Sequence, residues 1–88
     1  MNADTLFNKE NVIAMQSEAV VSGSLHELPH GRWEFWVKGR QNPPLAKHSQ
    51  VKLNLLTTDN EACQNFAATL IGLEARDDHW VYRLKWNR

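Results

Sequence analysis

The stretch Gly31–Gly39, GRWEFWVKG, decides the fold. Its side chains Trp33, Phe35 and Val37 alternate with Glu34, Trp36 and Lys38. A period of two predicts a half-buried β-strand, with the first set facing a core and the second facing water. The exception is Trp36, a large aromatic side chain on the charged side of the strand.

The same period of two recurs on both sides of this stretch. It predicts strands over residues 18–28, 32–39, 50–57, 65–75 and 79–86. Gly23, inside the first of them, indicates a bulge or a sharp bend. Turn formers separate the strands at LPHG, TDNEACQ and RDD. Pro43 and Pro44 forbid regular pairing within the segment RQNPPLAKHSQ, which is therefore predicted to be a connection between the second and third strands.

Five such strands predict a mainly β domain. No strongly amphipathic helix is available to cover the sheet, so we expect residues 18–88 to form a small antiparallel β-barrel or a strongly curled sheet. Trp33 and Trp80 follow the inward alternation and are predicted core residues. Residues 1–17 are predicted to be either a partly ordered tail or a short helix, with Leu6, Phe7, Val12, Ile13 and Met15 on its apolar face.

Composition narrows the class of protein. The chain has 88 residues, enough for one domain, and ten Lys and Arg balance ten Asp and Glu. This neutrality argues against a general nucleic-acid coat protein, which needs a basic surface. The single Cys63 cannot form an internal disulfide, which fits a reducing compartment. The first residues lack the pattern of a secretory signal, and no apolar run is long enough to cross a bilayer. We expect a cytoplasmic protein of a bacterium.

Catalytic and metal-binding patterns are weak. His26 and His30 are four residues apart, but in a strand and a turn this spacing does not pair the two rings, and His48 and His79 add no motif. Cys63 has Glu61 nearby and no basic neighbour to lower its pKa. Asp77 and Asp78 fit a turn better than an acid–base pair. We expect no enzyme activity, no metal and no cofactor.

A binding surface is the better-supported prediction. Trp36 shares its side of the strand with Arg32 and Lys38, and Trp and Arg are enriched at interface hot spots. Trp86 near the end of the chain raises the same possibility. The predicted binding residues are Trp36, Arg32, Lys38, Arg40, Arg83, Lys85 and Trp86, with Arg88 in the same basic patch. The alternative for Trp36 is that it covers an open end of the barrel or packs under residues 1–17.

The C-terminal half, residues 43–86, resembles the second half of PilZ domains, the six-stranded barrels with which bacteria read cyclic di-GMP. The resemblance lies in the Pro-Leu turn at residues 44–45, the Val-x-Leu-x-Leu strand at 51–55, the Phe-x-Ala strand at 66–68 and the closing aromatic strand. The ligand motifs of that family are absent: no arginine precedes Arg32, and SGSLHELPHG lacks the Asp/Asn-x-Ser-x-x-Gly spacing. No binding residue is therefore carried over.

Three functions remain open. The first is a non-enzymatic binding module, an adaptor or regulator that contacts another protein, or a second copy of itself, through the face around Trp36. The second is a barrel that binds single-stranded nucleic acid by stacking bases on its aromatic residues. The third, implied by the resemblance, is a divergent cyclic di-GMP receptor.

Overall fold

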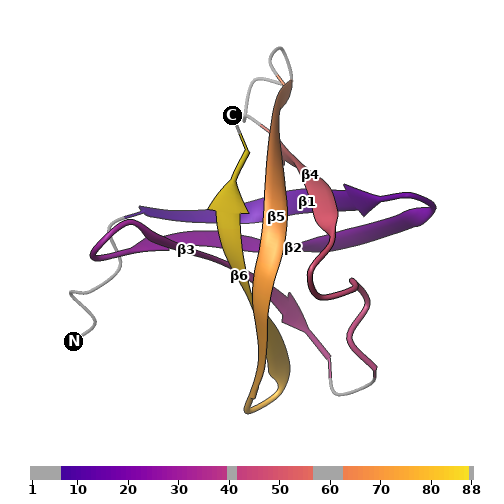
Figure 1. Ribbon diagram of the computed structural model, residues 1–88, viewed down its shortest axis with the longest axis vertical. Helices are drawn as coiled ribbons and strands as arrows, with labels where there is room; N and C mark the ends of the chain where they lie inside the picture. The colour runs from indigo at the N-terminus through magenta and orange to yellow at the C-terminus, as the bar shows by residue number, and fades with distance from the viewer. Residues whose placement is uncertain (1–6, 40–41, 57–62, 88) are drawn as a thin grey trace.

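The computed structural model describes residues 7–39, 42–56 and 63–87, with the backbone alone at residues 56, 63 and 64. It is a closed barrel of six antiparallel strands (Figure 1). The strands are β1 (Phe7–Gln16), β2 (Ala19–Leu28), β3 (Arg32–Lys38), β4 (Gln50–Leu56), β5 (Cys63–Arg76) and β6 (His79–Trp86). The barrel and all five predicted strands are confirmed, and the described residues contain no helix.

The order around the barrel is β1-β2-β3-β6-β5-β4, and β4 pairs with β1 to close it. In Figure 1 the hairpin strands β1 and β2 run across the direction of β5 and β6, so that the two halves of the barrel cross at a steep angle. Closure gives every strand a paired neighbour on both sides over part of its length, which reduces the unpaired edge that could act as a template for aggregation.

Residues 7–16 form a strand, so the helix or tail expected over residues 1–17 is wrong for them. Residues 1–6 lie outside the described residues. In β1 the register with β2 shifts between Lys9 and Val12, where one extra residue is accommodated and Asn11 takes a left-handed φ of 61°. This bulge interrupts the alternation that a period-two search depends on.

The bulge expected at Gly23 lies instead on the neighbouring strand, opposite it. Gly23 itself allows a close approach, because a Cβ there would lie 2.3 Å from the backbone oxygen of Trp36. A second bulge lies in β5 between Leu70 and Gly72. Bulges of this kind bend a strand and help a sheet to close.

The inward-facing residues of all six strands, together with Leu45 from the β3–β4 connection, make one core. Its buried members are Val12, Ala14, Leu25, Phe35, Val37, Leu45, Val51, Leu53, Ala68, Leu70, Tyr82 and Leu84. Trp33 and Trp80 face the same way and pack against this core, but each is half-buried. Their predicted inward direction is confirmed, and they lie at the margin of the core.

One end of the barrel is closed by the connection between β3 and β4. Leu45 is 2% exposed. The hydroxyl of Tyr82 accepts a hydrogen bond from the backbone N–H of Leu45 and donates one to the carbonyl of Leu45, and each bond is 2.9 Å long. The backbone N–H of Ala46 donates a further hydrogen bond, 3.1 Å long, to the side-chain oxygen of Gln16. Burial raises the pKa of Tyr82, so the hydroxyl stays protonated and able to donate.

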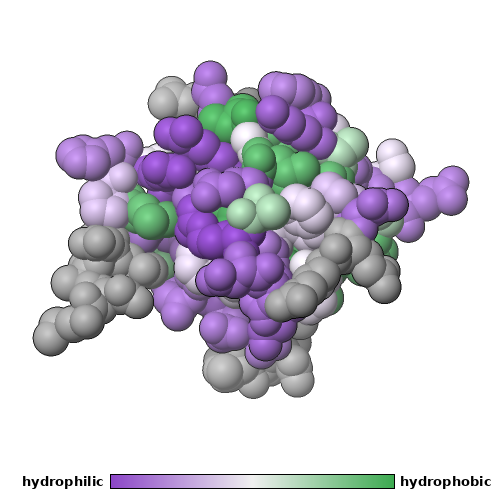
Figure 2. Space-filling model, turned by 90° about the horizontal axis from the view of Figure 1, so that it is seen from below, coloured by the Kyte–Doolittle hydropathy of each residue, from purple (hydrophilic) through white to green (hydrophobic). Residues whose placement is uncertain are grey.

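The surface near the β5–β6 hairpin is mainly polar. Figure 2 views the molecule from below, the side toward which this hairpin points in Figure 1, and hydrophilic residues dominate it, with hydrophobic residues in separate smaller patches. In the part of the chain that the structure describes, no helix is long and apolar enough to span a membrane.

Tyr82→Phe is expected to lower the free energy of unfolding by about 1–3 kcal/mol, because it leaves the buried N–H and C=O of Leu45 without their partner. Urea unfolding followed by tryptophan fluorescence measures the change. Thr69→Val, which removes an exposed hydroxyl bonded to Asn87, is the control and is expected to stay within about 0.5 kcal/mol. Equal stability of Tyr82→Phe and the parent would contradict this account of the closed end.

Candidate functional site

A buried carboxylate lies at the centre of the outer face of the barrel. Glu34 is only 1% exposed, although it points away from the core. Its Oε1 accepts a 2.9 Å hydrogen bond from the Trp36 Nε1–H, and its Oε2 lies 3.2 Å from Arg32 Nε. Arg76 Nη1 from β5 lies 3.9 Å from Oε1. A buried charge is tolerated where partners of this kind surround it.

Trp36 covers this carboxylate and is itself half-buried. His26 from β2 and His79 from β6, the strands on either side of β3, contact the indole with ring centroids 3.9 and 5.1 Å away. The guanidinium of Arg76 lies 6.0 Å from the indole. The tryptophan on the charged side of GRWEFWVKG therefore belongs to a small outer cluster of Glu34, Trp36, His26, His79 and Arg76.

His26 is the most buried histidine of this cluster, at 5% exposed. Its Nε2 lies 2.8 Å from Ser24 Oγ. Burial lowers the pKa of His26 below its usual 6.5 and outweighs the nearby carboxylates of Glu10 and Glu34, while His79 acts in the same direction as burial. His26 is therefore mainly neutral at pH 7.

Exposed cations surround the outer cluster. Lys38, Arg83 and Lys85 point outward from β3 and β6, and within the described residues none of the three makes an ion pair. Arg83 lies opposite Glu34 in the β3–β6 register. A polar hollow of about 240 Å³ lies beside Glu34, and its charged lining residues are Arg32, Glu34, Lys47, Glu74 and Arg83.

The structure brings together five of the seven predicted binding residues, on the outer faces of β3 and β6. They are Arg32, Trp36, Lys38, Arg83 and Lys85. Trp86 lies elsewhere, on the inward side of β6 at the end of the barrel opposite Leu45. Arg40 and Arg88 lie outside the described residues.

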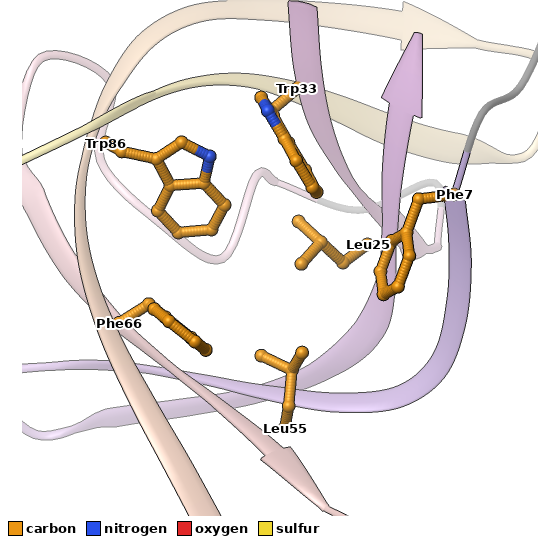
Figure 3. A pocket seen from close by; sticks show the side chains of 6 residues that line it. All are labelled: Phe7, Leu25, Trp33, Leu55, Phe66 and Trp86. Atoms are coloured by element: carbon orange, nitrogen blue, oxygen red, sulfur yellow. The ribbon is translucent and has the colours of Figure 1, made fainter.

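The end of the barrel opposite Leu45 is a second candidate site, which the sequence did not predict. A cavity of about 450 Å³ opens there between one apolar side chain from each strand: Phe7, Leu25, Trp33, Leu55, Phe66 and Trp86. Figure 3 shows these side chains converging on one open space. The alternation of Trp33, Phe66 and Trp86 was visible in the sequence, but only the strand order shows that they meet.

The acidic residues considered for catalysis, Asp77 and Asp78, lie in a turn next to the outer cluster. Asp77 and Asp78 form the β5–β6 turn, with a left-handed φ of 55° at Asp77, and Asp78 Oδ1 lies 3.3 Å from His79 Nδ1. The side chain of Cys63 lies outside the described part. Among the described residues, no three His, Cys, Asp or Glu side chains are grouped so that they could hold a metal ion.

No family model matches the chain, and no curated protein or solved structure is similar enough to count as a match. The PilZ resemblance therefore stays a prediction.

Trp36→Ala is expected to lower the free energy of unfolding by about 2 kcal/mol, because it uncovers Glu34 and removes one of its hydrogen-bond donors. This loss is larger than the loss expected of a fully exposed side chain. Urea unfolding of Trp36→Ala and of Val20→Ala, a change at a side chain 68% exposed, gives the comparison. Equal midpoints for the two variants would show that Trp36 covers nothing of consequence.

Acidification is expected to destabilise the fold through His26. Its pKa is lowered in the folded state, so the unfolded chain binds the proton more readily. The contribution of neutral His26 to the free energy of unfolding is complete above about pH 6.5. It decreases as the pH falls from there toward the lowered pKa of His26 in the folded state.

Thermal unfolding of the parent, His26→Gln and His48→Asn at pH 7.5 and 5.5 measures this effect. The decrease in Tm on acidification is expected to be smaller in His26→Gln and unchanged in His48→Asn. His48 is an exposed histidine whose left-handed φ of 65° suits asparagine. A decrease in His26→Gln as large as in the parent would assign the effect to other groups.

Proposed function

We propose that this chain is a non-enzymatic binding module, an adaptor or regulator, whose outer face on β3 and β6 contacts an acidic surface of another protein. One observation carries the proposal. The outward positions of these two strands bear Arg32, Lys38, Arg83 and Lys85 against the single carboxylate of Glu34, in a chain with no net charge. Such local asymmetry steers an oppositely charged partner.

The rigidity of the outer cluster also favours a protein partner. Glu34 and Trp36 are already held by hydrogen bonds and ring contacts, so they offer a preformed surface whose ordering costs little on binding. The exposed cations around them supply the charge. A bacterial cytoplasmic location and a regulatory role remain part of the proposal.

Binding of single-stranded nucleic acid is the alternative, and the contacts of Trp36 disfavour it. Stacking a base on an aromatic ring needs a free ring face. The indole of Trp36 already contacts two histidine rings, one from each neighbouring strand. A base would have to displace one of them. A cyclic di-GMP receptor rests on the family resemblance alone.

The test is an NMR titration of the isotope-labelled protein with a glutamate-rich peptide, with an oligo-dT strand and with cyclic di-GMP. We expect the peptide to shift backbone amides of β3 and β6, and the effect to weaken with added salt, because the contact is between exposed charges.

The matched variants are Arg83→Glu with Lys85→Glu on this face, and Lys52→Glu on β4 as the control. Lys52 is exposed and points outward from a strand that pairs with neither β3 nor β6. The double variant is expected to lose peptide binding and the control to keep it. Peptide binding that survives the double reversal, or tighter binding of oligo-dT or cyclic di-GMP to the same face, would overturn the proposal.

A further inference from the structure

Four aromatic rings lie one after another around the open end of the barrel. Phe7 and Trp33 have centroids 5.8 Å apart, Trp33 and Trp86 5.2 Å, and Trp86 and Phe66 5.8 Å. The planes of successive rings are inclined at 52°, 74° and 63°. The rings therefore form the successive walls of a cage. Leu25, 1% exposed, and Leu55 complete the lining.

An acidic residue, Glu27, occupies the strand position between two of these rings. Glu27 on β2 pairs with Phe7 on β1 and with Trp33 on β3. Residues directly opposite each other in antiparallel strands share a face, so Glu27 points toward the side of the cage. Glu27 is half-buried, and within the described residues its side chain makes no hydrogen bond or ion pair.

One cation shares this side of the sheet. Lys9 on β1 lies opposite Leu25, one inward position beyond Phe7, and it is also half-buried. It makes no ion pair with Glu27 within 4 Å in the described structure. Glu27 is thus the charged residue placed between cage rings, where its carboxylate attracts a cation. Lys9 lies farther along its strand from the rings, and its charge partly offsets this attraction.

We propose that this end of the barrel binds a methylated ammonium group, the head of a choline-type molecule or of a methylated lysine. Ring faces carry negative electrostatic potential, and a cation within about 6 Å of several ring centroids is attracted to all of them. Methyl groups suit the apolar lining, whereas a primary ammonium would lose hydration there without enough acceptors. Glu27 supplies the opposite charge. This proposal is independent of the one for the outer face.

The cavity also has a suitable size. Its volume of about 450 Å³ lies in the range of small-molecule sites, about 300–1,000 Å³. The opposite end of the barrel differs, because Leu45 covers the core there. A hollow of about 440 Å³ near Leu45 has Trp80 as the one aromatic side chain among its described lining residues. Phe7 and Phe66 are 38% and 41% exposed, so two walls of the cage are accessible to an incoming group.

The test compares choline with 3,3-dimethylbutan-1-ol, which has the same shape and no charge. NMR signals of the indole N–H groups of Trp33 and Trp86 report binding, and those of Trp36 and Trp80, away from the cage, serve as internal references. We expect choline to shift the first two and to bind at least about fivefold more tightly than its neutral analogue. Equal affinity for the two, or no shift with choline, would overturn the proposal.

Two charge variants separate the cage from a merely apolar hollow. Glu27→Gln is expected to weaken choline binding about threefold or more and to leave the neutral analogue unchanged, whereas Lys9→Met is expected to strengthen choline binding. Trp86→Leu keeps an apolar wall but is expected to reduce choline binding by about tenfold, with the neutral analogue less affected. Glu18→Gln, an exposed change in the β1–β2 turn at the other end, is the control. Choline binding that is insensitive to both Glu27→Gln and Trp86→Leu would contradict the cage.

A trimethyl-lysine peptide, compared with the same peptide carrying unmodified lysine, identifies the source of the group. Tighter binding of the methylated peptide than of choline assigns the cage to a protein partner. Tighter binding of choline assigns it to a small molecule. Equal binding of the methylated and unmodified peptides would overturn the proposal, because the cage would then not recognise methylation.

Discussion

The pairing of β1 with β4 is the constraint on which the rest of the structure depends. Val12, Ile13, Ala14 and Met15 lie opposite Leu55, Asn54, Leu53 and Lys52, and this short ladder turns a six-stranded sheet into a closed barrel. Closure gives the chain an inside, which a small domain needs because its surface is large for its volume. It also defines two ends of the barrel, one covered by Leu45 and the other open.

At one end the chain closes its own barrel. The connection with Pro43 and Pro44 cannot pair as a strand, and it places Leu45 over the core, held by the hydroxyl of Tyr82. At the other end six apolar side chains stand around an open cavity, with Glu27 beside two of its rings. The outer face of β3 and β6 is a separate surface, organised by a buried carboxylate. The two candidate sites therefore lie on different parts of the barrel and are open to independent tests.

The sequence predicted the elements whose alternation is unbroken. Trp33, Phe35 and Val37 showed the inward side of β3, and the turn at Asp77 and Asp78 was visible from its composition. β1 was missed because the bulge at Asn11 shifts its inward side from Phe7 and Lys9 to Val12 and Ala14, so that neither a period of two nor a helical period fits the whole segment. A local pattern cannot show that the segment after the bulge pairs with β4, which lies far away along the chain.

The candidate sites were predicted less well, for a related reason. A glutamate on the outer side of a strand is normally read as solvated, and the burial of Glu34 depends on Trp36, Arg32 and Arg76 meeting above it from two strands. The aromatic cage depends on all six strands at once. Trp86 was grouped with the basic residues of β3 and β6 but lies on the inward side of β6, since the strand order, and not the sequence separation, decides which aromatic residues meet.

The most direct test of this account is a measurement of nuclear Overhauser effects between backbone protons of β1 and β4. The closed barrel predicts cross-strand contacts linking Val12 with Leu55 and Ala14 with Leu53, together with slow amide exchange along this ladder. Helical contacts within residues 7–16, or rapid exchange in β1 with no contact to β4, would contradict closure, and with it the aromatic cage to which Phe7 contributes.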